Sequence, residues 1–255
     1  MSIRFENVTK TFGSRAVLKD ISFEVNTGEI LFILGKSGMG KSVTLKHIVG
    51  VMKPDTGRVR VDQEDVTSLK ARELFKIRRK CGMVFQHPAL LDSLTVFDNV
   101  SFGLKTPQYI QSLSQPLSPD EILDIVIEKL ALVHLGPEIL ERLPTELSYG
   151  MQKRVSLART LAPQPSYLLF DEPTTGLDPI TTRAINALIL DLSKKLKVTS
   201  IVVSHDMSCA LEIADRILVL DQAQILAHDR VDEIKKSKDP LISAFLEETL
   251  AQNLE

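Results

Sequence analysis

The residues that most clearly predict chemistry form a glycine-rich stretch, Gly35-Lys36-Ser37-Gly38-Met39-Gly40-Lys41-Ser42. The stretch matches the spacing G-x-x-x-x-G-K-[ST] at every fixed position. Its glycines let backbone N–H groups curl around phosphate oxygens, and the helix expected next directs its N-terminus at the same anion. Lys41 would supply positive charge to the β- and γ-phosphates, and the Ser42 hydroxyl would reach Mg²⁺. The stretch therefore predicts a site for a nucleoside triphosphate with Mg²⁺.

A second group consists of two adjacent carboxylates, Asp171 and Glu172, which follow the apolar run 167–170 and precede Pro173. A buried strand would deliver both carboxylates to its end. Asp171 suits Mg²⁺ coordination, directly or through water. Glu172 is the candidate general base that polarises the attacking water. Two surface acids before a proline would be an equally good interpretation in isolation, but the phosphate loop favours catalysis.

A third candidate is His205, which comes directly after the apolar run 200–203. A histidine at this place can hydrogen-bond a γ-phosphate and respond to its presence. A lone histidine is more often structural. We assign no catalytic role to the other histidines, which are His47, His87, His134 and His228.

The elements expected around these residues give them a common scaffold. The apolar run 29–34 reads as a buried strand and 41–49 as a helix, which is the strand–loop–helix context that a phosphate loop requires. Further along, strands at 167–170 and 200–203 alternate with helices at 179–196 and 207–214. Alternation of this kind predicts an α/β fold with a mostly parallel sheet covered by helices on both faces.

Two regions depart from that alternation. The first sixty residues read as short strands separated by turn residues, and 217–220 with 224–227 read as a hairpin. Residues 100–165 read as helices only, so we predict an inserted helical sub-domain there. Within it, 105–119 reads as a surface loop, Ser118 as the N-cap of a helix to about Leu135, and 149–161 as a second helix. One domain would then cover 1–255, with a helical extension from about 230 to 255.

Composition limits the class of protein. The 255 residues carry a net charge of −2, which disfavours a generic nucleic-acid binder. The only cysteines, Cys81 and Cys209, lack metal-site spacing and suit a reducing compartment. The N-terminal segment lacks the apolar core of a signal peptide, and no apolar run is long enough to span a bilayer. We therefore expect a cytoplasmic chain, peripheral to the membrane if it serves one.

Further motifs show a resemblance to the nucleotide-binding subunits of ABC transporters. The segment Leu147-Ser148-Tyr149-Gly150-Met151-Gln152-Lys153-Arg154 looks like the signature sequence of that family. Gln86 resembles the glutamine of the Q-loop, Thr174-Thr175-Gly176-Leu177-Asp178 resembles the D-loop, and His205 resembles the switch histidine. Phe12 stands where these proteins carry an aromatic residue that stacks on adenine. The likeness covers nearly the whole chain, with the motifs in the family's order.

The resemblance implies a P-loop NTPase fold of the ABC type, with an N-terminal antiparallel β sub-domain and an inserted α-helical sub-domain. It also implies a homodimer in which Ser148 and Gly150 of one copy close over ATP on the phosphate loop of the other, and in which Asp178 also contacts the nucleotide. Gln86 would sense Mg²⁺ or the lytic water. Integral membrane permease subunits would dock beside that glutamine, around 87–99, on the inner face of the cell membrane.

Two signature positions depart from the commonest pattern, because Tyr149 replaces the first glycine and Met151 replaces the glutamine. We expect the Tyr149 side chain to point away from the phosphate and leave the close approach to Gly150. The signature with methionine, together with the segment 85–100, resembles the ATPases of Mla-type or MCE-associated lipid transporters. That likeness implies phospholipid cargo and a lipid-binding MCE-type subunit as a further partner.

Other functions are weighed against this one. Amino-acid importers share much of the segment 85–100, so a small-solute importer is the alternative within the family. ABC-type proteins of DNA repair or translation usually carry a long coiled-coil insertion or two fused nucleotide domains, which this sequence does not show. A non-hydrolysing binder would be expected to lack a catalytic residue, whereas Lys41, Asp171, Glu172 and His205 are all present.

Overall fold

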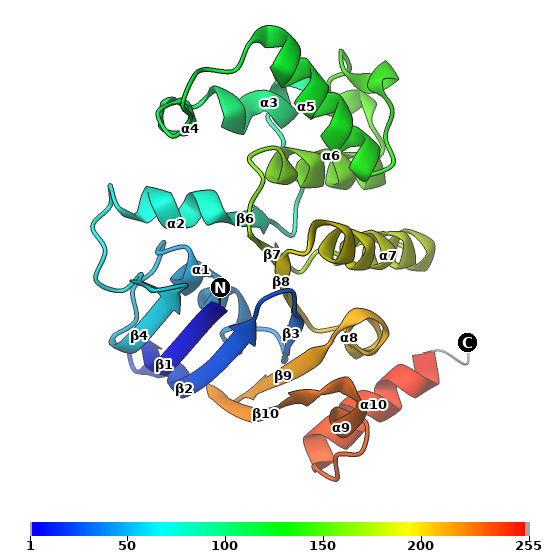
Figure 1. The fold of residues 1–255 in the computed structure, drawn as a ribbon. Helices are drawn as coiled ribbons and strands as arrows, with labels where there is room; N and C mark the ends of the chain where they lie inside the picture. The colour runs from blue at the N-terminus through cyan, green and yellow to red at the C-terminus, as the bar shows by residue number, and fades with distance from the viewer. Residues whose placement is uncertain (1, 253–255) are drawn as a thin grey trace. The chain divides into compact units, whose positions relative to one another are not determined.

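The computed structural model describes residues 2–252 and divides into two compact units (Figure 1). Unit 1 comprises 1–77 and 189–255, and unit 2 comprises Arg78–Leu188. Helices α2 (Leu74–Lys80) and α7 (Pro179–Leu196) contribute residues to both units. The end of the expected C-terminal extension, 253–255, lies outside the described residues.

Unit 1 begins with an antiparallel sheet in the order β2-β1-β4-β5. Its strands are β1 (Ser2–Phe12), β2 (Arg15–Asn26), β4 (Thr56–Val61) and β5 (Glu64–Asp65). Ile3 and Phe5 are buried, in keeping with side chains that alternate between two faces, and the register shift between Phe5 and Val8 brings Val8 to the buried side as well. Phe5 lies opposite Phe23, and their rings stack with centroids 4.5 Å apart. The expected N-terminal antiparallel β sub-domain is therefore confirmed.

The second sheet of unit 1 is largely parallel. Its strands are β3 (Ile30–Leu34), β8 (Thr199–Ser204), β9 (Arg216–Asp221) and β10 (Gln224–Arg230). Strand β3 pairs in parallel with β8 on one side and with β9 on the other, while β10 pairs antiparallel with β9. All five residues of β3 are buried, as a central parallel strand requires.

Unit 1 contains four helices that lie wholly within it among the described residues. They are α1 (Lys41–Ile48), α8 (Met207–Ile213), α9 (Val231–Ile234) and α10 (Pro240–Gln252). Two of them, α1 and α8, begin at the predicted residues 41 and 207. Helix α8 is capped by Asp206, whose carboxylate accepts a hydrogen bond from the Cys209 backbone N–H at 3.2 Å.

Unit 2 combines one parallel strand pair with a group of helices. The strands are β6 (Cys81–Val84) and β7 (Tyr167–Asp171). The helices between them are α3 (Val96–Ser101), η1 (Phe102–Lys105), α4 (Pro107–Ile110), α5 (Pro119–Leu132), η2 (Pro137–Ile139), η3 (Pro144–Glu146) and α6 (Tyr149–Leu161). Helix α6 has the predicted bounds, and Ser118 forms the expected cap of α5 as part of a capping box with Glu121.

Two local predictions within unit 2 are wrong. The expected loop 105–119 contains the short helix α4, because the Thr106 hydroxyl accepts from the Tyr109 backbone N–H and Pro107 occupies the first turn. Helix α5 ends at Leu132 and not near Leu135, because Val133 leaves the helical conformation and His134 adopts a φ of +58°.

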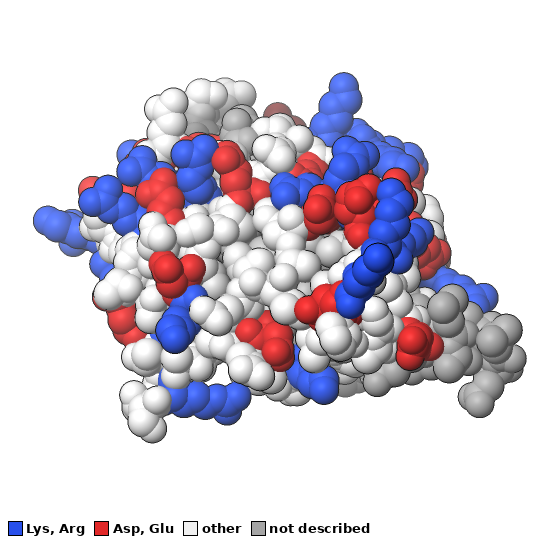
Figure 2. Space-filling view, turned by 90° about the horizontal axis from the view of Figure 1, so that it is seen from below, with Lys and Arg blue, Asp and Glu red and all other residues white. Residues whose placement is uncertain are grey.

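The surface shows no dominant sign of charge on the face in Figure 2, where Lys and Arg side chains are interleaved with Asp and Glu around an uncharged centre. An interleaved surface of this kind fits the near-neutral sequence and gives that face no extended basic track. Within residues 2–252, every helix is too short or too polar to cross a bilayer.

Candidate nucleotide site

The phosphate loop follows the carboxyl end of strand β3. Leu34, the last residue of that strand, pairs with Ser204 of β8 and with Val219 of β9. The chain leaves the sheet at Gly35, and helix α1 begins at Lys41. Ligands of open α/β sheets bind outside the carboxyl ends of the strands. The loop is therefore in the part of unit 1 where a nucleotide is expected.

Two glycines of the loop are required by the space around them. Gly40 has a φ of +91°, and a Cβ atom there would lie 2.7 Å from the Val17 carbonyl oxygen. A Cβ atom at Gly35 would lie 2.6 Å from the Leu220 carbonyl oxygen. Both neighbours are backbone atoms, so a larger residue would displace the loop itself. The part between them, 36–38, is exposed and offers its backbone to a ligand.

Lys41 closes the loop from within. Its side chain is only 6% exposed, and its ammonium group donates to the Gly35 carbonyl at 2.7 Å and to the Lys36 carbonyl at 3.3 Å. Gly40, the N-cap of α1, has no side chain with which to cap the helix, and the positive end of the helix dipole there favours an anion. A cradle of backbone donors with a fixed cation fits a triphosphate, and the half-buried Ser42 beside it fits Mg²⁺.

The structure brings His205 beside this loop. Leu34 and Ser204 are register partners in adjacent parallel strands, and Gly35 and His205 are the residues that follow them. His205 is exposed there. Phe12 lies at the end of β1 with 47% of its surface exposed, and the Lys10 ammonium is 5.6 Å from its ring centroid. An accessible aromatic ring of this kind is able to stack on a base.

One residue near the loop was missed by the sequence reasoning. Arg15 begins β2, and its guanidinium donates to the Gly38 carbonyl at 3.3 Å. It is exposed, so its charge is available to a bound phosphate group. Its separation from the loop along the chain gave no signal, because the contact depends on how the antiparallel sheet folds back.

In unit 2, strand β7 ends at Asp171, and Glu172 follows it with a φ of +50°. Positive φ is uncommon for a residue other than glycine and often marks a functional site. The Thr175 hydroxyl donates to the Glu172 carboxylate at 3.1 Å, which holds that side chain in one direction. Both acids are half-buried. This arrangement is consistent with the predicted metal ligand and general base, although these roles stay predictions.

The signature forms the start of helix α6. Ser148 is the N-cap, and its hydroxyl accepts from the Met151 backbone N–H at 3.4 Å. Gly150 lies in the first turn of this helix. A Cβ atom at this position would lie 3.4 Å from the Thr181 methyl group. The Tyr149 hydroxyl lies 3.4 Å from the Gln86 carbonyl oxygen and 3.4 Å from His87 Nδ1. The unusual tyrosine of the signature therefore contacts the segment that follows β6.

The same segment is held by Lys153, to which the sequence reasoning gave no separate role. Lys153 is 4% exposed, and its ammonium group donates to the Gln86 carbonyl and, at 3.0 Å, to the Pro173 carbonyl. Burial lowers the pKa of this ammonium group to about 8. The Gln86 side chain itself is exposed. Unit 2 therefore brings Gln86, the signature helix and the residue after Glu172 into one cluster.

Asp178 is engaged in the start of helix α7. Its carboxylate accepts from the backbone N–H groups of Ile180 and Thr181, each at 3.0 Å. Hydrogen bonds from Thr181, first from its hydroxyl and then from its backbone, hold the pKa of Asp178 below its usual value. The residue acts as a helix cap in this structure, and its predicted contact with a partner's nucleotide stays a prediction.

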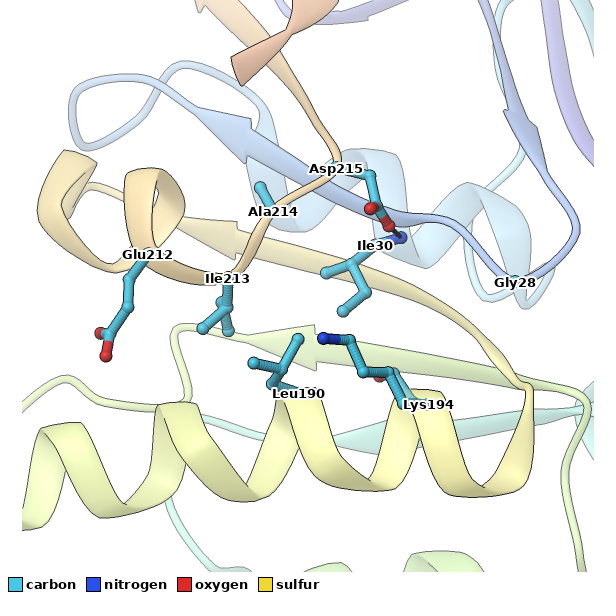
Figure 3. A pocket seen from close by; sticks show the side chains of 9 residues that line it. Gly28, Ile30, Leu190, Lys194, Glu212, Ile213, Ala214 and Asp215 are labelled. Carbon is cyan, nitrogen blue, oxygen red and sulfur yellow. Dashed lines mark hydrogen bonds between the residues drawn. The ribbon is translucent and has the colours of Figure 1, made fainter. Parts of the chain in front are cut away.

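A small hollow of about 270 Å³ lies at the other end of β3 (Figure 3). The Asp215 carboxylate at its edge accepts from the Ile30 backbone N–H at 2.8 Å, and Lys194 and Glu212 also line it. Gly28 and Ile30 place this hollow at the amino end of the strand, away from the carboxyl end that leads into the phosphate loop. It is therefore distinct from the nucleotide site.

These features define a P-loop nucleotide-binding domain. The family described as ABC transporter matches residues 18–175, which is more than half of the chain. The chain therefore belongs to the ABC transporter family and contains the ATP-binding domain of that family. This confirms the predicted fold class.

Individual relatives agree with that assignment. The methionine import ATP-binding protein MetN of Bradyrhizobium diazoefficiens is 39% identical over 99% of this chain and 72% of that protein. The probable ribonucleotide transport ATP-binding protein mkl of Mycobacterium tuberculosis is 35% identical over 96% of this chain. This chain spans 66% of the length of the mkl protein, so it corresponds to about two thirds of that relative.

Solved structures agree as well. A dimeric structure of MJ0796, a bacterial ABC transporter cassette, has a TM-score of 0.80 and 34% identity, over 90% of this chain and 98% of that one. The cbiO1 protein of Clostridium perfringens, part of the ABC transporter complex cbiONQ, has a TM-score of 0.82 and 28% identity, over 96% and 94% of the two chains.

Proposed function

We propose that this chain hydrolyses ATP as a homodimer and couples that reaction to transport through integral membrane permease subunits. The observation that carries the proposal is the phosphate loop, in which the buried Lys41 ammonium binds the carbonyl groups of Gly35 and Lys36. Two related structures, both of MJ0796, are dimers, and one of them is bound to ADP and phosphate. Ser148 and Gly150 would complete the site of the second copy through the N-terminus of α6.

Within this proposal each candidate residue has a role. Glu172 is the general base, Lys41 and His205 contact the γ-phosphate, and Phe12 stacks on adenine. Ser42, Asp171 and Gln86 would hold Mg²⁺, which neutralises charge on the β- and γ-phosphates. Asp178 contributes at the interface between copies.

A variant that binds ATP without hydrolysing it tests the proposed homodimer. The Glu172→Gln variant should bind Mg²⁺-ATP without hydrolysing it and should double its mass by light scattering when ATP is added. A second variant that also carries Lys41→Ala should stay monomeric, because it lacks the phosphate contact. A Glu172→Gln chain that stays monomeric with saturating ATP would overturn the head-to-tail arrangement.

Support for a permease comes from an apolar hollow of about 410 Å³ in unit 2. Three exposed apolar side chains line it, Phe85, Leu91 and Phe102, with exposed fractions of 43%, 41% and 50%. Arg159 fixes its rim by donating to the Ala89 carbonyl at 2.7 Å and the Pro88 carbonyl at 3.1 Å. Exposed apolar side chains around a firm hollow suit a helix of another chain.

The Phe102→Asp variant should abolish co-purification with the permease and leave ATP binding unchanged. Leu123→Asp is the matched control, because Leu123 is 37% exposed on α5 and does not line the hollow. Equal recovery of membrane subunits with all three proteins would place the permease elsewhere.

For the cargo we propose phospholipid, with the chain peripheral on the inner face of the cell membrane and an MCE-type lipid-binding subunit in the complex. The support is the likeness of the signature with Met151, and of the segment 85–100, to lipid-transport ATPases. Asn99, within that segment, is buried, and its side chain forms hydrogen bonds with backbone groups of Leu91, Leu94 and Thr95. These bonds hold the loop in its conformation. Asn99 is therefore explained by the conformation of the loop, and the support for phospholipid comes from Met151 and the other residues of the segment 85–100.

Import of a small solute is the second candidate. It is favoured by the names of relatives, which include methionine and sulfate import proteins, each 39% identical. Pull-down of the full chain from detergent-solubilised membranes, followed by mass spectrometry of subunits and lipids, separates the candidates. An MCE-type subunit with enriched phospholipid supports lipid transport, whereas an amino-acid or anion permease without enriched lipid overturns it.

A further inference from the structure

A buried lysine joins three segments of unit 2 that are distant in the sequence. Lys153 lies one turn beyond Gly150 on helix α6, and its ammonium group donates to the carbonyl oxygens of Gln86 and Pro173. Gln86 follows strand β6, and Pro173 comes directly after Glu172. Val84 and Phe170 are register partners in the parallel pair β6 and β7, so both carbonyls lie beyond the same edge of the sheet.

The chemistry of this contact makes it a strong constraint on the backbone. A cation that is 4% exposed has exchanged water for these carbonyl groups, and hydrogen bonds from a charged donor are stronger than neutral ones. The Tyr149 ring covers the ammonium group with its centroid 5.6 Å away, and its hydroxyl lies 3.4 Å from the same Gln86 carbonyl. Removing the ammonium group would leave two backbone acceptors without this donor.

We propose that Lys153 is a positioning residue for ATP hydrolysis, which holds the backbone at Gln86 and at Pro173 to the signature helix. The placement of Glu172 then depends on the helix whose N-terminus closes over the partner's nucleotide. This inference rests on the proposed roles of Glu172 and Gln86. A positioning role affects the chemical step, because a small misplacement of a reacting group is costly.

The test compares Lys153→Met with Lys129→Met in the full chain, assembled with its membrane subunits if the chain alone shows no turnover. Lys129 is the matched control, because it is also buried in unit 2, at 5% exposure, but pairs with Glu128. Lys153→Met should lower kcat for Mg²⁺-ATP by about tenfold or more and change KM and ATP affinity by less than about twofold. Lys129→Met should leave kcat unchanged, even if it lowers the melting temperature.

A third variant, Lys153→Gln, keeps two N–H donors without the charge and should restore part of kcat. It also serves if the methionine variant does not fold. An unchanged kcat in Lys153→Met would overturn the proposal. If Lys129→Met lowered kcat as much as Lys153→Met, the role of Lys153 would be purely structural. The same conclusion would follow if Lys153→Gln had the thermal stability of the wild type but the low kcat of Lys153→Met. Either result would also overturn the proposal. Full activity of Glu172→Gln would instead overturn the proposed general base, so the two failures are distinguishable.

Discussion

The phosphate loop of unit 1 is held together differently from the signature cluster of unit 2, by which we mean Tyr149 and Lys153 of helix α6 with Gln86, His87 and Pro173. The loop is shaped by backbone atoms, because the space at Gly35 and Gly40 is limited by carbonyl oxygens and the Lys41 ammonium binds carbonyls of the loop itself. The signature cluster is held by long side chains, in which Tyr149 and Lys153 reach across more than sixty residues of sequence to Gln86. The cluster therefore depends on residues that a short motif does not specify.

This difference has a functional consequence. A backbone cradle recognises phosphate by geometry that many sequences share, whereas side-chain contacts are able to vary between members of a family. We therefore expect substitutions in the loop to weaken nucleotide binding, and substitutions in the cluster to lower turnover.

The largest effect is expected for Glu172→Gln. Loss of a general base should lower ATP turnover by about 10²- to 10⁴-fold, because the amide is unable to accept the proton of water. ATP affinity, measured by titration with a fluorescent ATP analogue, should change little, since the phosphate loop is intact. Thr175→Val is the informative companion, because it removes only the 3.1 Å hydrogen bond to the Glu172 carboxylate and should lower turnover to an intermediate extent. Turnover of Glu172→Gln within tenfold of the wild type would show that another group activates the water.

The sequence predicts the features that local signals determine better than those that depend on long-range contacts, such as the signature cluster. The bounds of helix α6, and the strand and helix on either side of the glycine-rich stretch, follow from the sequence, because periodicity, capping residues and glycine spacing are local signals. The short helix at Pro107 was missed although Thr106 and Pro107 give a local start signal, because the surrounding polar and proline-rich composition favoured a loop. Lys153 and Arg15 were not predictable, because their partners are brought to them only by tertiary folding.

In the loop, Gly40→Ala should weaken ATP binding by roughly 10- to 100-fold, because the methyl group meets the Val17 carbonyl and the backbone is held at a positive φ that costs about 1–3 kcal/mol. Gly13→Ala is the control, since Gly13 also has a positive φ, of +60°, but among the described residues no atom lies within 4 Å of an added Cβ. Isothermal titration with ATP measures both. Affinity of Gly40→Ala equal to that of the wild type would show that the close approach to Val17 does not limit the loop.

Acid should lower the stability of unit 1, which contains the buried side of His228. Burial, and then the nearby Arg216, lower the pKa of His228 to about 4, and its ring packs edge-on against Phe23. Because the unfolded chain takes up the proton near pH 6.5, stability is retained above that pH and is lost as the pH falls towards 4. We expect this histidine to account for about 1–2 kcal/mol of that loss after allowing for its partial exposure.

Chemical denaturation at pH 7 and pH 5 measures this contribution, and His228→Leu should reduce the difference between the two pH values. His87→Leu is the control, because His87 is exposed and lies in the signature cluster of unit 2. If both variants keep the full acid sensitivity of the wild type, the loss of stability arises from other groups.

The smallest effect should come from Tyr149→Phe. This change keeps the ring that covers the Lys153 ammonium but removes a hydroxyl whose contacts with Gln86 and His87 are 3.4 Å long, near the limit for a hydrogen bond. We expect turnover within about twofold of the wild type and a change in unfolding free energy below about 0.5 kcal/mol. Tyr149→Gly, which restores the commonest signature residue, should have a larger effect, because it uncovers the ammonium group as well. If Tyr149→Phe lowered turnover as much as Lys153→Met, the tyrosine hydroxyl would contribute as much as the lysine to joining the signature to Gln86, contrary to this expectation.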